Sequence, residues 1–193
     1  MKNNFEIYNI DLPLLMKAMG YYQSVGYAPL SVPMITSYEA IRVTLPPRIK
    51  PMQHCDDLLN GFYVGSAEQS IYQMLIDNGC NDGKFMMLTP CQRGELYLDC
   101  RHMEIFLKLE LVQINVDNCT PIIDDVFPFL KSEFQDCEIE IVECLFGSSS
   151  KDININGVEV GSYGCRNFEG NIVQYGTGLA LPRITQAVNY LLK

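Results

Sequence analysis

The chain has 193 residues, of which 48% are apolar and only 19% are charged. This balance predicts a compact fold with a buried core and excludes an intrinsically disordered chain. Fourteen Lys and Arg residues against 23 Asp and Glu residues give a net charge of −9, so no general attraction to DNA or to an anionic membrane surface is expected. An RNA contact would need a local basic strip. The length predicts one domain over residues 1–193.

The N-terminal stretch Met1–Asp11 has no long apolar run, so neither a signal peptide nor a membrane span is expected, and the protein is predicted to be cytoplasmic. The eight cysteines contain no CxxC pair, and His54 and His102 are the two histidines of the chain. A zinc site is therefore disfavoured. The thiols are expected to be reduced and mostly buried.

The first predicted element is a helix that begins after Asp11 and ends at Gly26, because Asp11 is a good N-cap residue and apolar residues follow it at helical spacing. Residues 27–35 contain two prolines, which predict an edge or interface strand. Residues 36–60 have an irregular pattern and predict mostly loop with one short helix.

The middle of the chain predicts a short strand over 62–65, a helix over 67–78 and a strand over 84–90. The clearest pattern lies in residues 104–114, where Ile105, Leu107, Leu109 and Leu111 face one side and Glu104, Phe106, Lys108 and Glu110 face the other. One face of this strand is predicted to be core, and the other is predicted to form a polar floor that includes Lys108 and the neighbouring carboxylates.

The last third of the chain predicts helices at both ends of a run of strands. The expected order is helix 121–134, strands 138–144, 152–155, 158–161 and 172–174, and helix 179–192. Alternating strands with helices before, between and after them predict an α+β fold, an antiparallel β-sheet with flanking helices. The alternation of short strands and crossover helices that is typical of a parallel sheet is absent.

Three separated segments resemble the three motifs of class II aminoacyl-tRNA synthetases. Gly26-Tyr27 followed by Pro33-Met34-Ile35 resembles motif 1, which forms the dimer interface of that family, and the resemblance implies a homodimer with Pro33 at its interface. Cys91–Glu95 and the strand that follows resemble motif 2, with its Arg-x-Glu signature. Gly176–Arg183 resembles motif 3, a glycine-rich turn that opens a helix. The order and spacing fit, and the resemblance covers essentially the whole chain.

The resemblance implies ATP and Mg²⁺ as cofactors. In the family pattern Arg93 bridges the α-phosphate and the substrate carboxylate, while Arg183 holds the γ-phosphate and packs over adenine, so both would be catalytic. Phe106 would stack under the adenine ring. Glu95 would fix the adenine or its neighbouring loop, and His102 would contact the phosphate side of ATP. These roles agree with the chemistry, because an attack on a phosphate by a carboxylate needs permanently charged groups that neutralise two anions.

Gly178 belongs to the glycine-rich turn and is also expected at the ATP site, although such glycines could serve the turn alone. Glu159 stands where the family places a carboxylate on Mg²⁺, and phosphates would supply other ligands of the ion. The alternative for Glu159 is an exposed position on a strand.

The amino acid substrate is implied to meet Ser66, Glu68 and Arg166. Ser66-Ala-Glu68 resembles a Thr-x-Glu element that receives the substrate's α-amino group. Arg166 stands where aspartyl and asparaginyl enzymes read the substrate side chain, which favours an acidic or amide amino acid. The alternative is a surface ion pair of Arg166 with Glu169 or Asp152.

The signals for the particular substrate conflict, because Ser66–Glu68 and Gly178–Arg183 are more similar to seryl enzymes. The chain is predicted to be a catalytic core without an anticodon-binding domain. The expected function is ATP-dependent amino-acid activation and transfer to tRNA or to another acceptor, and amide formation from an aspartyl adenylate stays open. The alternative is a catalytically silent paralogue that binds a nucleotide or an amino acid as a regulatory or accessory subunit.

Overall fold

A computed structural model describes residues 9–45, 60–94, 103–117, 120–144 and 150–189, and the backbone of residues 55–56. The helices are α1 (Leu12–Ser24), α2 (Tyr38–Thr44), α3 (Ala67–Ile76), α4 (Ile122–Glu133) and α5 (Arg183–Val188). The strands are β1 (Ala28–Pro29), β2 (Ile35–Thr36), β3 (Cys55–Asp56), β4 (Gly61–Tyr63), β5 (Gly83–Gln92), β6 (Ile105–Ile114), β7 (Ile139–Glu143), β8 (Lys151–Ile155), β9 (Val158–Phe168) and β10 (Asn171–Leu181).

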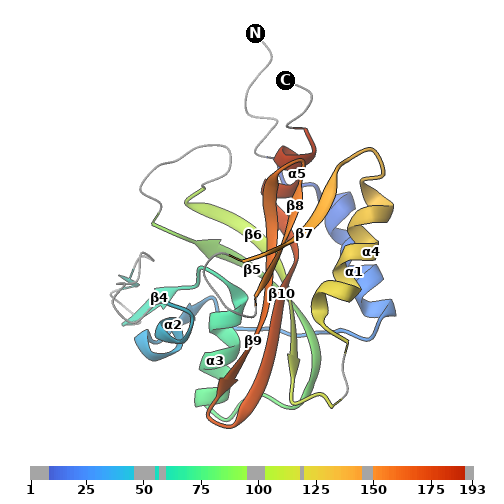
Figure 1. Cartoon of the computed structure of the whole chain (residues 1–193). Helices are drawn as coiled ribbons and strands as arrows, with labels where there is room; N and C mark the ends of the chain where they lie inside the picture. The colour runs from blue at the N-terminus through green and yellow to red at the C-terminus, as the bar shows by residue number, and fades with distance from the viewer. Residues whose placement is uncertain are drawn as a thin grey trace.

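A large, mostly antiparallel sheet forms the centre of the molecule (Figure 1). Over the described residues its strand order is β1-β5-β6-β10-β9-β8-β7, and β2, β4 and β3 form a second, small sheet. One pairing of the large sheet departs from the expected antiparallel pattern, because β1 runs parallel to β5 at its edge. The α+β fold with an antiparallel sheet and flanking helices is confirmed.

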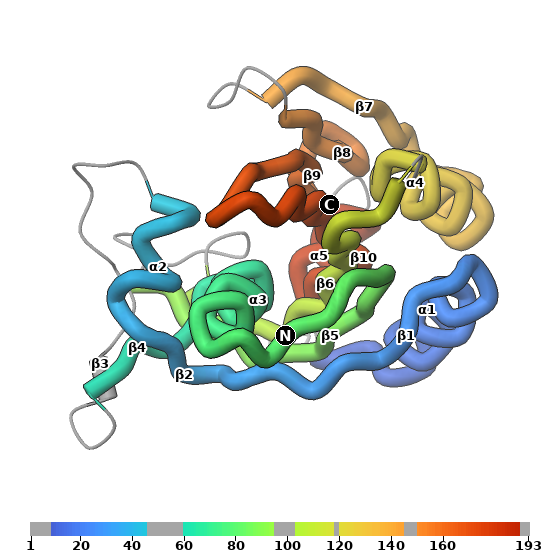
Figure 2. The backbone as a smooth tube through the Cα atoms, turned by 90° about the horizontal axis from the view of Figure 1, so that it is seen from below, coloured from blue at the N-terminus to red at the C-terminus, as the bar shows by residue number. Residues whose placement is uncertain are grey.

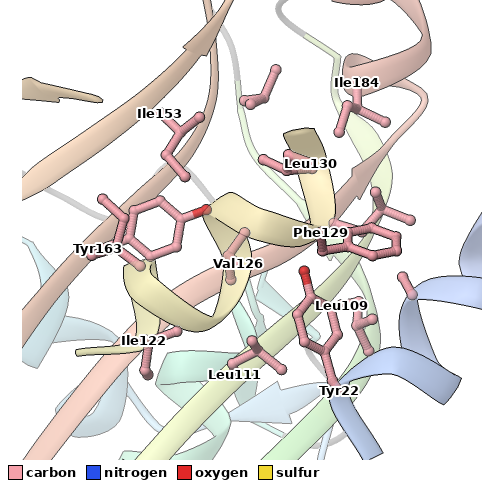
Figure 3. Close-up of a cluster of buried hydrophobic side chains, with 14 of the residues drawn as sticks. Tyr22, Leu109, Leu111, Ile122, Val126, Phe129, Leu130, Ile153, Tyr163 and Ile184 are labelled. Carbon is pink, nitrogen blue, oxygen red and sulfur yellow. The ribbon is translucent and has the colours of Figure 1, made fainter. Parts of the chain in front are cut away.

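Helices α1, α4 and α5 cover one face of the large sheet (Figure 1). Helix α1 begins as expected, since the side chain of Asp11 accepts a hydrogen bond from the backbone N–H of Leu14 at 3.0 Å. Tyr22 of α1 and Phe129 of α4 are fully or almost fully buried between the helices and the sheet. Figure 3 shows this core, in which side chains of both helices meet Leu109 and Leu111 of β6.

Helix α3 covers part of the other face and builds a second core against β5, β6 and β10 (Figure 2). Ser66 is its N-cap, as expected, and the helix ends before the predicted residue 78. Helix α2 packs beside α3 and is a short helix of the kind expected within residues 36–60. The part of this sheet face that α3 leaves uncovered carries the polar half of β6.

The C-terminal boundary between strand and helix differs from the sequence prediction. Residues 176–181 continue β10, and α5 begins at Arg183, whereas a turn followed by a helix from residue 179 was expected. The glycines of this segment serve close packing in a strand. A Cβ atom on Gly176 would overlap the ring of Tyr163 and lie 2.8 Å from Cγ2 of Ile122. Strand β9 is likewise longer than the predicted 158–161.

The cysteine prediction holds in part. Cys80, Cys91, Cys137, Cys144 and Cys165 are free thiols, but of these five described cysteines only Cys91 is buried. The expectation of mostly buried thiols is therefore wrong for the described part of the chain. Within the same residues, no helix combines the length and the apolar character that crossing a membrane requires.

Candidate functional site

A polar cavity lies on the sheet face that α3 leaves uncovered, and it has two adjoining parts. We call them the small half, with a volume of about 70 Å³, and the large half, with a volume of about 370 Å³. Arg93, Lys108 and Ser162 line both halves and mark the boundary between them. A ligand that fills both halves would therefore pass beside two cations.

The small half brings together two arginines and an aromatic ring. The guanidinium carbon of Arg93 lies 5.1 Å from the centre of the Phe106 ring, and Nε of Arg93 donates a hydrogen bond to the Gly65 carbonyl at 3.1 Å. Arg183 also lines this half, and its Nη1 lies 3.8 Å from Oε1 of the exposed Glu159. Among the described residues no carboxylate pairs with Arg93. A guanidinium group that lines a cavity is suited to bind an anionic ligand.

Two β-bulges shape the walls of the cavity. The β8–β9 register shifts so that Ile153 pairs with Gly161 and Asn154 pairs with Glu159, which leaves Val160 as an extra residue. Side chains of a regular strand alternate between faces, and this extra residue lets Glu159 share a face with Ser162. A second shift in β10, at Gly178, lets Thr177 and Ala180 both line the small half although they are an odd number of residues apart.

The large half contains an ion pair between the buried Glu68 on α3 and the half-buried Arg166 on β9. The Tyr72 hydroxyl donates a hydrogen bond of 2.8 Å to the same carboxylate, and the Arg166 guanidinium carbon lies 4.5 Å from the centre of the Tyr175 ring. Burial raises the pKa of the Glu68 carboxyl above its ordinary value, although the Arg166 charge acts in the opposite direction. The alternative partners of Arg166, Glu169 and Asp152, are thus replaced by Glu68.

A second ion pair, both members of which are buried, forms the floor of the large half. Lys108 donates to Oε1 of Glu110 at 2.8 Å, and the Ser66 hydroxyl donates to Oε2 of the same carboxylate at 2.5 Å. Lys108 and Glu110 are two residues apart on β6, so the alternation of strand side chains places both on the cavity face. This arrangement confirms the polar floor predicted from the alternating pattern of residues 104–114.

The structure brings most of the sequence-predicted site residues to one cavity. Arg93, Phe106, Glu159 and Arg183 line its small half, and Ser66, Glu68 and Arg166 line its large half. Glu95 and His102 lie outside the described residues.

Two predicted residues lie away from the cavity walls. Gly178 faces Tyr22 of α1, on the opposite side of the sheet from the cavity. Pro33 lies between β1 and β2, where its carbonyl accepts a hydrogen bond from Ser70 at 2.6 Å.

Sequence reasoning did not assign Lys108, Ser162 or Tyr175 to the site. For Lys108 the signal was present, since it alternates with Leu107 and Leu109 on the predicted polar face. Ser162 and Tyr175 depend on the lengths of β9 and β10, which the sequence analysis made too short. Their place at the cavity follows from strand register, which is a long-range property.

The protein groups that line the small half could hold a magnesium ion only if a bound ligand or water supplied further oxygen atoms. Glu159 is a carboxylate that lines this half, and the described residues contain no group of three or more His, Cys, Asp or Glu side chains that could hold a metal. Mg²⁺ binds oxygen ligands and can be held by one or two carboxylates together with phosphates. An ion held by Glu159 would thus need phosphate oxygens or water as its other ligands.

Comparisons with known proteins identify the fold. The sequence matches no family model and no curated protein. Among solved structures, the cytoplasmic serine–tRNA ligase from Naegleria fowleri in complex with AMP has a TM-score of 0.71 at 13% identity, covering 95% of this chain and 48% of its own. Seryl-tRNA synthetase from Pyrococcus horikoshii complexed with ATP has a TM-score of 0.71 at 16% identity, and the match covers 96% of this chain and 51% of that enzyme.

A pyrrolysyl-tRNA synthetase from Desulfitobacterium hafniense, PylSc, is also similar, with a TM-score of 0.66 at 15% identity over 91% of this chain and 67% of its own. The chain spans about half the length of the two seryl enzymes. At these identities the comparisons establish the fold alone. The chain has the α+β fold of class II synthetase catalytic domains, as the three sequence motifs implied.

Proposed function

We propose that this protein activates an amino acid with ATP, forming an aminoacyl adenylate and releasing pyrophosphate. The observation that carries the proposal is the two-part cavity. Arg93, which has no carboxylate partner among the described residues, stands at the boundary. Arg183 and Phe106 line the small half, and the paired Glu68 and Arg166 line the large half. Such a cavity can hold a nucleotide and an amino acid side by side, with a cation where they meet. The AMP and ATP complexes of the similar seryl enzymes support the nucleotide half of the proposal.

The proposed reaction needs orientation and charge neutralisation. A carboxylate oxygen of the amino acid attacks the α-phosphorus of ATP, the bond from that phosphorus to the bridging oxygen breaks, and pyrophosphate leaves with the electron pair. Arg93 would bind both the attacking carboxylate and the α-phosphate, holding them in line and reducing their repulsion. Arg183 would bind the leaving phosphates and Phe106 would support the adenine ring. Mg²⁺ bound by Glu159 would supply further neutralisation of the phosphates.

The amino acid would occupy the large half. Its α-ammonium group would bind the Glu68 carboxylate, which Ser66 helps to position at the start of α3. Arg166 would read the side chain, and a bidentate guanidinium contact favours a carboxylate or an amide, such as aspartate or asparagine. The aminoacyl group would then pass to tRNA or to another acceptor. A cytoplasmic homodimer built around the segment of Pro33 completes the proposal.

The first test is ATP binding. A ligand that binds the folded state alone raises its stability, by about 2.7 kcal/mol at a hundredfold excess over the dissociation constant. We expect the unfolding temperature to rise with ATP and Mg²⁺, and the rise to shrink in Arg183→Ala. Arg42→Ala is the matched control, because Arg42 lies on α2 outside the cavity walls. An unfolding temperature that ATP leaves unchanged in the unmodified protein contradicts the proposal.

The second test is pyrophosphate exchange with each of the twenty amino acids. Exchange with at least one of them, lost in Arg93→Ala, is the expected result. ATP binding without any exchange would favour the silent paralogue instead. One feature of the large half supports that alternative, because Glu68 and Arg166 already neutralise each other there without a substrate.

A further inference from the structure

Lys108 occupies the boundary between the two halves of the cavity. It lies on β6 between Phe106, which lines the small half, and Glu110, which lines the large half, and it lines both halves itself. Only 10% of its side chain is exposed. Lys108 and Arg93 are thus two cations at the same boundary, and only Lys108 has a carboxylate partner among the described residues.

Among the described residues, the hydrogen bonds of the Lys108 ammonium group leave one of its three N–H donors without an acceptor. A lysine ammonium group has three N–H donors and no acceptor. Within the described residues two acceptors are present, Oε1 of Glu110 at 2.8 Å and Oγ of Ser66 at 3.4 Å, the second of which is long. A buried charged donor without an acceptor is costly, so such donors are usually satisfied by protein, water or ligand. The open space beside Lys108 is the cavity itself.

Glu110 needs a cation to neutralise it, but that cation does not have to stand where Lys108 stands. The other oxygen of this carboxylate already accepts a hydrogen bond from Ser66 at 2.5 Å, and the positive charge could have come from any element packed on Glu110. Instead the cation stands at the junction with Arg93, where a ligand crossing from one half to the other must pass. A charged N–H donor of Lys108 there would give an anionic ligand a hydrogen bond in addition to those from Arg93.

We propose that Lys108 is a second catalytic cation of this site, which donates its remaining N–H to an anionic oxygen of the ligand at the boundary. The inference rests on the proposed function, in which that oxygen belongs either to the α-phosphate or to the attacking carboxylate. In both cases Lys108 lowers the repulsion between the two anions, while its bond to Glu110 keeps the ammonium group in place.

The test separates this role from that of a simple counterion. Lys108→Met removes the charge but leaves Glu110 buried without its cation, and this variant alone could fail to fold. The double variant Lys108→Met/Glu110→Gln removes both charges together, and Glu110→Gln alone is its matched reference. Each protein is titrated with ATP, AMP and adenosine, and pyrophosphate exchange is then measured with the preferred amino acid.

We expect the double variant to fold. Its ligand affinity or its rate of pyrophosphate exchange should nevertheless be at least about tenfold lower than that of Glu110→Gln, because one hydrogen bond to a charged group is lost. A loss in AMP and ATP affinity with unchanged adenosine affinity places the oxygen on the α-phosphate. A loss confined to the amino-acid KM or to the exchange rate places it on the carboxylate. Both results support the proposal.

Two other results overturn it. If the double variant binds and exchanges as well as Glu110→Gln, Lys108 is only the counterion of Glu110, while the proposed function stands. If the unmodified protein binds neither ATP nor AMP, the proposed function fails and the role of Lys108 at this boundary fails with it.

Discussion

Gly178 offers a direct test of how the small half of the cavity is built. This glycine stands at the bulge of β10, and its Cα faces the helix side of the sheet. A Cβ atom added there would lie 2.9 Å from Cε2 of Tyr22 and 3.3 Å from the carbonyl oxygen of Leu109. We therefore expect Gly178→Ala to lower the stability of the protein by overpacking the core, and to alter the cavity by displacing the bulge of β10.

The neighbouring ring has little room to move. Tyr22 is fully buried, its ring packs on Phe129 with centroids 5.6 Å apart, and its hydroxyl donates to the Gly178 carbonyl at 2.8 Å. Overpacking of a close-packed core costs about 1–3 kcal/mol. For a chain of this size each kcal/mol lowers the unfolding temperature by about 2–4 °C, so a decrease of about 2–12 °C is expected.

The assay is thermal unfolding followed by circular dichroism, with ATP titration of the folded protein at low temperature. Gly20→Ala is the control, because a Cβ at this position in α1 would meet no atom within 4 Å, and alanine is the better helix former by about 1 kcal/mol. That variant should unfold at the same or a higher temperature. If Gly178→Ala unfolds like the unmodified protein but binds ATP more weakly, Gly178 contacts the nucleotide and our packing argument is wrong.

Three further predictions concern the large half of the cavity and the proposed homodimer. Arg166→Lys keeps the charge but loses the planar fork, so exchange with aspartate should fall by about tenfold or more, and an unchanged rate would show that Arg166 does not read the side chain. Because burial raises the pKa of Glu68 above 4.5, the stability due to this group is present at acid pH and decreases as the pH rises through the folded value. The unmodified protein and Glu68→Gln are compared by urea unfolding. The unfolding free energy of the first minus that of the second should thus decrease from pH 4 to pH 7, and an increase would show that burial does not raise this pKa. The segment of Pro33 should form a homodimer interface, for which Met34, 43% exposed, supplies apolar surface. Light scattering at tens of micromolar should give a dimer that Met34→Glu weakens, whereas a monomeric mass for the unmodified protein would refute this interface.

Local pattern was enough to predict much of the fold. Asp11 and Ser66 cap helices where expected because an N-cap interaction involves only residues within one helical turn. The alternation in residues 104–114 predicted both the core face and the polar floor of β6, since side chains of a strand alternate whatever lies beside them. The three motifs then implied the class II fold, and most residues named on those motifs line one cavity.

Other features depended on contacts between distant residues. Gly176 and Gly178 indicate a turn in the sequence, but both lie in strand β10. Glycine is required there because Tyr163 and Tyr22 occupy the space that a side chain would need. The bulges that turn Glu159 and Thr177 to the cavity are properties of strand register.

The sequence of this protein by itself determined the kinds of elements, the fold class and the residue types available for anion binding, because these follow from short-range periodicity and local chemistry. Tertiary structure alone decided that Glu68 pairs with Arg166, 98 residues later in the chain, and that Lys108 stands beside Arg93 between two halves of one cavity. Such pairings arise where separate strands and helices meet, and no local pattern specifies the register at which they meet.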